Sequence, residues 1–329
     1  MYSAKFFDLD DETAAKQFKI KDDTCVWTGR EGEELPPYVF TDEIAIAVDV
    51  AVATGRPLLI SGAPGSGKSI LAPTLARMKG WRFLSHTFTS RTRLEDLTGE
   101  LDHLSRLGDA QALQDGEALP PKWTYLSPGI LWWAFNPDMA YKRGGDDSII
   151  DELKTKKKFT HPQPQSDGDT QDVVLLLDEI DKAEPDLPND LLDPLDKGLF
   201  EVPQGPKVEA LGHQCLVVIT TNGERELPPA FLRRCIRLHL KEPDKKRFLE
   251  IADYHFPDCE DDAHEYVAST LMKLIDEAKH RGLRSPSTSE YLDAIKAYRE
   301  LKDLTPDQKE EVWARVAQVS LRKAPLNDE

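Results

Sequence analysis

The chain has 329 residues, enough for one large and one smaller domain, and 40% of them are hydrophobic, which supports a real core. Its formal net charge of −17 argues against broad, non-specific binding to nucleic acid, because such binding needs a positive surface. No apolar run approaches the roughly 20 residues that cross a bilayer, and the N-terminal residues lack the apolar segment of a secretory signal. The sequence therefore predicts no membrane segment and a cytoplasmic location. The scattered cysteines predict neither disulfides nor a zinc site.

The N-terminal residues 1–37 are polar and acidic, with few periodic apolar positions. They predict an arm that is loosely structured or packed on a neighbour. Thr41 then has the side chain of a helix N-cap, and acidic residues follow it in the first turn. We expect a largely covered helix that stops near Gly55.

The next segment carries the most specific motif of the chain. It fits the pattern G-x-x-x-x-G-K-[ST] at every fixed position, with the residues Gly62, Ala63, Pro64, Gly65, Ser66, Gly67, Lys68 and Ser69. Residues 57–61 before it predict a buried strand, and Ile70 lies in the first turn of the helix after it. In this context, the inward-facing N–H groups of the loop and the helix N-terminus hold phosphates. Lys68 would reach the β- and γ-phosphates, and Ser69 would offer its hydroxyl to Mg²⁺, so the motif predicts ATP and Mg²⁺ as ligands.

The segment after the phosphate loop continues the alternation of helix and strand. Pro73 lies within the next predicted helix, where we expect a bend. Residues 81–88 predict the second strand, and residues 93–123 predict a helix-and-loop region. A break in composition at residues 137–171 predicts a long surface insertion, partly disordered, with a cluster of lysines at residues 154–158.

A continuous apolar run at residues 173–177 ends in Asp178 and Glu179. It predicts a buried parallel strand that delivers two carboxylates to the edge of the sheet where ligands bind. Asp178 would hold Mg²⁺, directly or through water, and Glu179 would orient and activate the attacking water. Asp181 and Lys182 after them predict a surface turn.

The rest of the chain first completes the α/β pattern and then becomes helical. We expect a hairpin at residues 200–210, a buried strand that ends in Asn222, a short helix that ends in two arginines, and a last strand at residues 235–240. From Pro243 onward, apolar residues recur at helical spacing only. This change predicts a small all-helical domain at residues 243–329.

Taken together, these features resemble the AAA+ ATPases. Three strings are similar to the MoxR branch of that family: Asp96-Leu97-Thr98-Gly99, Ser127-Pro128-Gly129-Ile130 and Glu226-Leu227-Pro228-Pro229-Ala230-Phe231-Leu232-Arg233-Arg234. The resemblance covers roughly residues 38–300. It implies an α/β P-loop NTPase fold, in which a five-stranded parallel sheet of order 5-1-4-3-2 is flanked by helices. It also implies an ATPase domain at residues 38–242 and a helical lid at residues 243–329.

The resemblance assigns roles to polar residues around the motif. Asn222 would lie between the phosphate loop and the Asp-Glu strand and contact the γ-phosphate or the attacking water, as sensor 1. The family forms rings, usually of six subunits, with ATP at each interface. An arginine after the short helix then reaches the neighbour's γ-phosphate. Arg234 matches this position, and Arg233 is the alternative.

The chain departs from the MoxR pattern at one point. The family's sensor 2 arginine follows a Ser-Pro pair, whereas here Ser287 occupies that position. Arg284 is the first substitute, and Arg281 is the second. The adjacent Trp132 and Trp133 suggest either a substrate-gripping role or core packing, and core packing is the better interpretation for at least one ring.

Three functions remain open at this point. The first is a homo-oligomeric ring that hydrolyses ATP and remodels a partner protein; relatives that the chain resembles often work with a protein carrying a metal-binding adhesion-type domain. The second is a nucleotide-dependent assembly or signalling switch with slow hydrolysis. The third is a DNA-directed motor, which the acidic balance of the chain disfavours.

Overall fold

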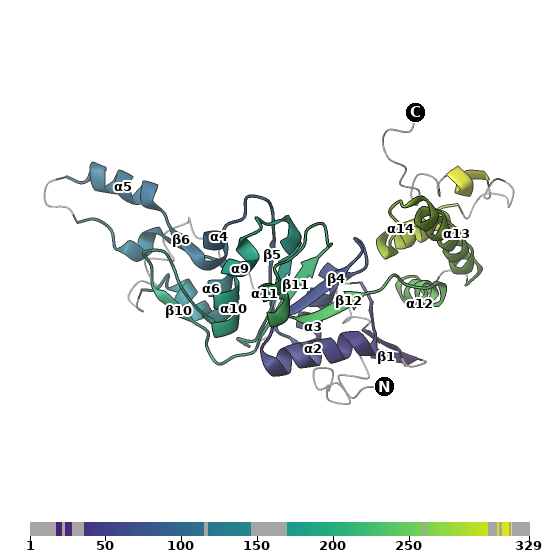
Figure 1. The fold of residues 1–329 in the computed structure, drawn as a ribbon, viewed down its shortest axis with the longest axis horizontal. Coiled ribbons are helices and arrows are strands. Elements are labelled where there is room, and N and C mark those ends of the chain that lie inside the picture. The colour runs from purple at the N-terminus through teal and green to yellow at the C-terminus, as the bar shows by residue number, and fades with distance from the viewer. Residues whose placement is uncertain are drawn as a thin grey trace.

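A five-stranded parallel sheet forms the centre of the protein. The computed structural model describes residues 18–21, 24–27, 36–114, 118–145, 170–258, 261–301, 308, 311–315 and 317. The strands of the sheet lie in the order β12 (Ile236–Leu240), β4 (Leu58–Gly62), β11 (Cys215–Thr221), β8 (Val173–Asp178) and β5 (Arg82–Thr87). All neighbouring strands are parallel (Figure 1). Counted along the chain from β4, this order is 5-1-4-3-2, which confirms the predicted fold.

Side chains of the central strands alternate between two hydrophobic cores, as strand geometry requires. In β4, Leu58 and Ile60 face one core, and Leu59 faces the other. The first core is covered by α2 (Asp42–Thr54) and α3 (Lys68–Lys79). The second core is covered by short helices: α4 (Leu94–Thr98), α6 (Ile130–Phe135), α7 (Pro137–Tyr141), α9 (Leu187–Asp190), α10 (Leu192–Lys197) and α11 (Pro229–Arg234).

Part of the predicted N-terminal arm has regular structure. The strands β1 (Phe18–Lys21) and β2 (Thr24–Trp27) form an antiparallel sheet with β3 (Tyr38–Phe40). Of the two alternatives for the arm, the loosely structured one was therefore wrong for these segments, because β2 pairs with both β1 and β3. The next helix, α2, begins and ends as predicted, at the N-cap Thr41 and at Gly55, which adopts the left-handed conformation.

An arm projects from the sheet between β5 and β8. It contains the antiparallel pair β6 (Gly99–Leu101) and β7 (Leu126–Pro128), with α5 (His103–Ala112) and the 3₁₀ helix η1 (Lys122–Tyr125) between them. Figure 1 shows α5 at the end of this arm, away from the sheet. At the base of the arm, a side chain on Gly129 would overlap the main chain of Leu97, so this close approach requires glycine.

Helices α6 and α7 pack at the base of this arm. Trp132 and Trp133 in α6 are both buried, which confirms core packing for the pair. The predicted insertion does not begin at residue 137, because α7 occupies residues 137–141 and buries Ala140. The remainder of that insertion, including the lysine cluster, lies mostly at residues 146–169, outside the described residues.

The elements between β8 and β12 follow the predicted order. They are the 3₁₀ turn η3 (Ile180–Lys182), α9 and α10, the hairpin of β9 (Leu199–Glu201) and β10 (Lys207–Glu209), the strand β11, and α11. The hairpin was expected from the turn between its strands.

The C-terminal region is helical. It contains α12 (Lys245–His255), α13 (Asp261–Arg281) and α14 (Thr288–Arg299), which Figure 1 shows grouped beside the β12 end of the sheet. These helices have a hydrophobic core of their own, in which Phe248, Leu271 and Tyr291 are buried. The division of the chain into domains near residue 242 stays a prediction. Within the described part of the chain, no helix has the length and apolar character needed to cross a membrane.

Candidate active site

The phosphate loop connects β4 to α3, as the motif predicted. β4 ends at Gly62, and α3 begins at Lys68 after the N-cap Gly67, whose φ is 89°. A side chain on Gly65, whose φ is 76°, would overlap the hydroxyl of Ser287 at the start of α14. Glycine at position 65 therefore permits both the turn of the loop and the close approach of the C-terminal helices.

The Lys68 side chain lies on the inner side of this loop. Its ammonium is buried and donates to the carbonyl oxygens of Gly62 at 2.8 Å and Ala63 at 2.9 Å. Burial lowers the pKa of Lys68, while the negative charge of Asp178 opposes this shift and the positive charge of Arg284 adds to it. Lys68 therefore carries a partly desolvated cation that an anionic ligand would stabilise.

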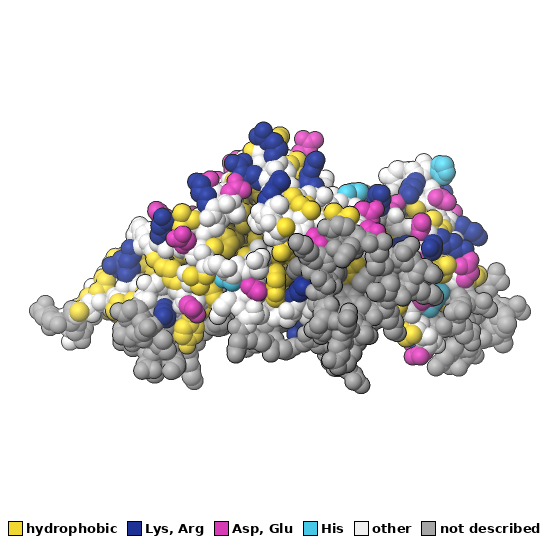
Figure 2. Space-filling model, turned by 90° about the horizontal axis from the view of Figure 1, so that it is seen from below, with side chains coloured by type: hydrophobic (Ala, Val, Ile, Leu, Met, Phe, Trp, Pro, Cys, Tyr) yellow, Lys and Arg dark blue, Asp and Glu magenta, His cyan; other side chains and the backbone are white. Residues whose placement is uncertain are grey.

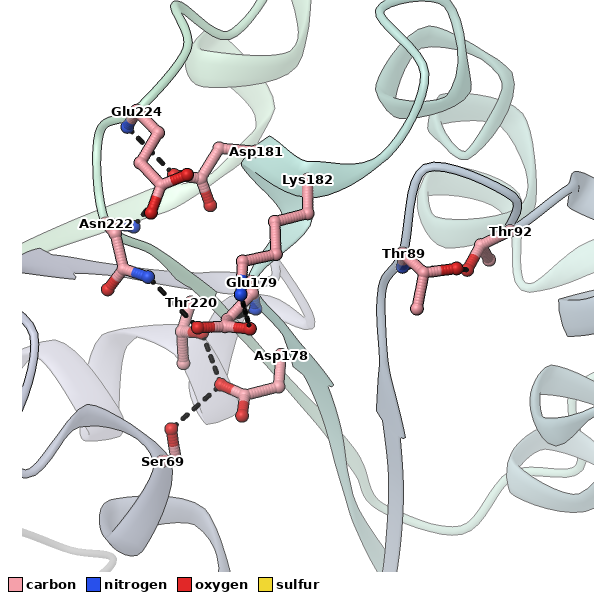
Figure 3. A network of polar contacts seen from close by, with 10 residues as sticks. All are labelled: Ser69, Thr89, Thr92, Asp178, Glu179, Asp181, Lys182, Thr220, Asn222 and Glu224. Carbon is pink, nitrogen blue, oxygen red and sulfur yellow. Dashed lines mark hydrogen bonds and ion pairs between the residues drawn. The ribbon is translucent and has the colours of Figure 1, made fainter.

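Asp178 joins the end of β8 to the start of α3. Its Oδ1 accepts hydrogen bonds from the hydroxyls of Ser69, at 2.9 Å, and Thr220, at 2.5 Å. Figure 3 shows Ser69 and Thr220 converging on this carboxylate. The sequence interpretation missed Thr220; the signal for it was a hydroxyl within the apolar run of β11, where it is fully buried.

Glu179 follows Asp178 in an unusual backbone conformation. Its φ of 60° and ψ of 50° lie in the left-handed region, which residues other than glycine seldom adopt. Its main-chain N–H donates to Thr220 Oγ1 at 2.9 Å. Its carboxylate accepts from Asn222 Nδ2 at 3.1 Å and from Lys182 Nζ at 2.6 Å. Both carboxylate oxygens are thus held by protein donors (Figure 3).

The expectation that Asp181 lies in a surface turn was wrong. Its side chain is only 3% exposed, and its Oδ2 accepts the main-chain N–H groups of Asn222 at 3.1 Å and Glu224 at 2.9 Å. The 3₁₀ turn η3 folds Asp181 back against the end of β11 and so fixes the segment that carries Asn222. Lys182, the next residue, does lie at the surface, where it pairs with Glu179.

A cavity of about 390 Å³ lies beside the phosphate loop. Its lining combines β3, the end of β12, α12 and α14, and includes Tyr38, Val39, Gly65, Leu240, Ile251 and Leu292. Arg247 of α12, also in the lining, donates to the carbonyl of Val39 at 2.6 Å and so ties the C-terminal helices to β3. A largely apolar cavity of this size next to a phosphate loop fits a nucleotide base. No sequence motif indicated this cavity, because its residues come from distant segments.

Arg284 lies in the segment between α13 and α14. Its charge contributes to the lowered pKa of Lys68, and its guanidinium lies 3.9 Å from Glu290 Oε1. Glu290 also accepts from the main-chain N–H of Ser287, at 2.7 Å, in a capping box at the start of α14. Of the two arginines considered for sensor 2, Arg284 is therefore the one with an electrostatic effect on the site.

The two arginines of α11 have different surroundings. Arg234 forms an ion pair with Asp196 of α10. Arg233 is exposed, and within the described residues its guanidinium has no hydrogen bond or ion pair. In the same part of the chain, no such interaction joins either arginine to the phosphate loop of its own chain.

The donor set fits ATP with Mg²⁺. Ser69 and Asp178 place two oxygen donors side by side, and Mg²⁺ is usually bound by one or two protein oxygens together with phosphate oxygens and water. The described ranges contain no group of three or more His, Cys, Asp or Glu residues able to hold a metal ion by themselves. A metal here would accordingly need a ligand such as a triphosphate to complete its coordination.

The comparisons with solved structures return weak fold likenesses. A point mutant of Thermotoga maritima RuvB has a TM-score of 0.45 and 15% identity, covering 84% of this chain and 67% of that one. The Thermotoga maritima RuvB Holliday junction branch migration motor has a TM-score of 0.41 and 15% identity, covering 84% and 66%. These likenesses carry no argument about function. No curated protein matches.

A family model gives the decisive comparison. The model described as AAA domain (dynein-related subfamily) matches residues 57–235, from the residue before β4 to the residue after α11. This range contains the phosphate loop, the two acids after β8, and Asn222. The family model does not name the MoxR branch, so the assignment to that branch stays a prediction. Because the match spans more than half of the chain, the protein belongs to the AAA domain family, in its dynein-related subfamily.

Proposed function

We propose that this AAA+ protein hydrolyses ATP and works as a ring, usually of six subunits in this family, on a partner protein. The observation that carries the proposal is the convergence of five side chains at the carboxyl edge of the sheet: Lys68, Ser69, Asp178, Glu179 and Asn222. These groups lie at or after the carboxyl ends of three neighbouring strands, and they would supply the parts that ATP hydrolysis needs.

ATP binding would use the loop and the neighbouring cavity. The main-chain N–H groups of the loop, which Pro64 lacks, and the N-terminus of α3 would hold the phosphates. Lys68 would exchange its two carbonyl acceptors for phosphate oxygens. The nucleotide base of ATP would enter the cavity beside Tyr38 and Ile251. We propose that the C-terminal helices, which line this cavity, act as a lid. Arg284 would approach the phosphates from that lid.

The chemical step would use the acids after β8. Mg²⁺, held by Ser69 and Asp178, would neutralise charge on the phosphates when bound. Glu179 would accept a proton from the attacking water, and Asn222, which already donates to Glu179, would orient that water or the γ-phosphate. Thr220 would hold both acids in position, because its hydroxyl contacts the Asp178 carboxylate and the main-chain N–H of Glu179.

Each site would be completed by an arginine from the adjacent subunit. Arg233 and Arg234 have no hydrogen bond or ion pair with the phosphate loop among the described residues, and both are exposed at the end of α11. The family resemblance assigns the role to Arg234, with Arg233 as the alternative. Asp196 would hold Arg234 in a fixed orientation until a neighbour docks. A trans-acting arginine contributes on the order of 10³-fold or more to the rate.

Two observations support a polypeptide as the partner. The arm of α5 carries Leu104, which is 83% exposed, and Leu107, which is 56% exposed. Figure 2 shows hydrophobic side chains along this part of the molecule, on the left. The formal net charge of −17 disfavours DNA or RNA in that role. The similarity to the MoxR branch adds the expectation of a partner with a metal-binding adhesion-type domain.

The test is a pull-down with the Glu179→Gln protein in the presence of ATP. This substitution removes the base and leaves Asp178 and the phosphate loop intact, so ATP should stay bound and the loaded complex should accumulate with its partner. Lys68→Ala is the matched control, because it should not bind ATP. Turnover at the wild-type rate by Glu179→Gln would contradict the assignment of the base, and DNA-stimulated turnover would restore the motor alternative.

A nucleotide-dependent assembly or signalling switch is the second candidate, and one observation favours it. Both carboxylate oxygens of Glu179 accept from protein donors, Asn222 and Lys182, so the base is engaged before any water arrives. Such an arrangement fits slow hydrolysis. A single-turnover measurement separates the two functions, because a switch would retain ATP for long periods even when its partner is present.

A further inference from the structure

Arg56 contacts the main chain at the end of α11. It lies just before β4, 177 residues from Arg233 in the sequence. Its Nη2 donates to the carbonyl of Arg233 at 2.5 Å and to that of Cys235 at 3.2 Å. Its Nε donates to the carbonyl of Arg234 at 3.0 Å. One guanidinium therefore bonds three consecutive carbonyl groups where α11 ends.

This contact meets a specific need of the helix. The last carbonyls of a helix have no partner within the helix, and a cation at that end also interacts favourably with the helix dipole. Pro57, which follows Arg56, has no N–H to offer them. The carbonyl of Pro57 instead accepts the N–H of Ile236 at 2.8 Å, where β12 begins to pair with β4. The Arg56 side chain thus links the start of β4 to the end of α11, next to the place where β12 pairs with β4.

The arginine pair of α11 lies on the main-chain segment that Arg56 contacts. The side chain of Arg234 has its own support in Asp196, but Arg233 has no side-chain hydrogen bond or ion pair within the described residues. The main chain at residues 233 and 234 sets the position from which each arginine side chain leaves the helix. Arg56 holds that segment against β4, the strand that leads into the phosphate loop.

We propose that Arg56 is a positioning residue that aims the arginine which α11 donates to the neighbouring subunit. The inference rests on the proposed function, because it requires an active site completed in trans. It assigns Arg56 to the donating side of the interface only. Among the described residues, the hydrogen bonds of the Arg56 side chain go to residues 233–235 and not to the phosphate loop, Asp178 or Glu179.

The experiment mixes full-length variants so that one subunit, the donor, can only supply the trans-acting arginine. The other subunit, the acceptor, can only supply the ATP site that receives it. The donor is Lys68→Ala, which cannot bind ATP but keeps its arginines. The acceptor is Arg233→Ala combined with Arg234→Ala, which binds ATP but cannot donate. Arg56→Gln is then introduced into the donor in one mixture and into the acceptor in another, and ATP hydrolysis is measured in each. Arg237→Gln in the donor is the matched control, since Arg237 is an exposed arginine of β12 without a side-chain partner in the described chain.

We expect Arg56→Gln in the donor to lower hydrolysis by about 100-fold, which is the order of loss for a catalytic group displaced by about 1 Å. The same change in the acceptor, and Arg237→Gln in the donor, should leave hydrolysis unchanged. Arg56→Lys in the donor should restore only part of the rate, because an ammonium cannot reproduce the planar fork. ATP affinity and ring mass, measured by nucleotide titration and sedimentation, should stay the same for Arg56→Gln.

Two results would overturn the role of Arg56 and leave the proposed ring mechanism in place. One is full activity with Arg56→Gln in the donor. The other is an equal loss on both sides or a loss of ring mass, which would mean a general structural role. If the unmodified donor cannot activate the acceptor, the trans-acting arginine itself is wrong, and both the proposed ring mechanism and the role of Arg56 fall.

Discussion

The hydroxyl of Thr220 lies 2.5 Å from Oδ1 of Asp178 and donates its proton to that oxygen. The same hydroxyl accepts the main-chain N–H of Glu179 at 2.9 Å. One fully buried side chain of β11 thus fixes both acids at the end of β8. The metal-binding and water-activating groups of the proposed mechanism are therefore held by a residue that lies outside the phosphate loop and away from solvent.

Replacing Thr220 with valine should lower ATP hydrolysis by about 10- to 100-fold, the usual range for partners that orient the ligands of a metal. The shape of the side chain is kept, but Asp178 loses a donor and the Glu179 N–H loses its acceptor. Thr98→Val is the control, because Thr98 is also buried and donates to a main-chain carbonyl, that of Leu94, away from the site. Steady-state rates for both proteins make the comparison, and an equal effect would contradict the role of Thr220.

Lys68→Ala should abolish ATP binding and leave the fold intact, because the ammonium of Lys68 serves the phosphate loop and no other element among the described residues. Titration with a fluorescent ATP analogue measures binding, and circular dichroism measures the fold. Unchanged affinity would contradict the assignment of the loop.

The lowered pKa of Lys68 also predicts a pH dependence of binding in the wild-type protein. Burial lowers this pKa from the usual 10.5, and phosphate binding needs the charged ammonium. ATP affinity should therefore fall as the pH rises through the lowered pKa, and this fall should begin at a lower pH than for a lysine with the usual pKa of 10.5. In the nucleotide-free protein, the same group should contribute increasing stability over that range, since the unfolded state binds the proton more tightly. Affinity titrated from pH 7 upward tests the first expectation, with Lys68→Arg as the control that stays charged.

Lys182→Met should raise basal hydrolysis. Lys182 donates to Glu179 Oε2 at 2.6 Å, and removing it frees one oxygen of the proposed base. The pair is partly exposed, so the effect should be modest, about fivefold at most. Lys197→Met serves as the control, because Lys197 of α10 forms a similar ion pair with Asp193 of the same helix. Both side chains of that pair are exposed. A fall in rate with Lys182→Met would mean that the pair holds Glu179 in its working position.

Hydrolysis per subunit should rise steeply with protein concentration, because in the proposed mechanism an arginine of the adjacent subunit completes each site. Mixing Arg234→Ala with Lys68→Ala subunits should restore part of the activity that each lacks alone. The same mixture with Arg233→Ala in place of Arg234→Ala decides which arginine acts in trans. Rates independent of both concentration and mixing would mean that the site is complete in one chain and would favour a monomeric switch.

The sequence by itself determined the features that depend on short stretches of chain. The strand, loop and helix around residues 62–69 were predictable because their glycines, lysine and apolar flanks are contiguous. The strand that delivers Asp178 and Glu179 was predictable for the same reason. Thr41 and Gly55 marked the ends of α2, since capping is decided by the local backbone. The order of the sheet followed from the family resemblance that these motifs carry.

Only the tertiary structure decided which distant residues meet. Thr220 and Glu179 are 41 residues apart, and Arg56 and Arg233 are 177 residues apart, so no local pattern records either contact. Asp181 was misassigned because a carboxylate after a strand usually lies in water, whereas here two main-chain N–H groups of the segment after β11 offset the cost of burying it. The cavity beside the phosphate loop arises from β3, β12, α12 and α14 together. Such features depend on how separate elements pack against one another. That packing is set by the whole hydrophobic core and not by the few polar residues that form the site.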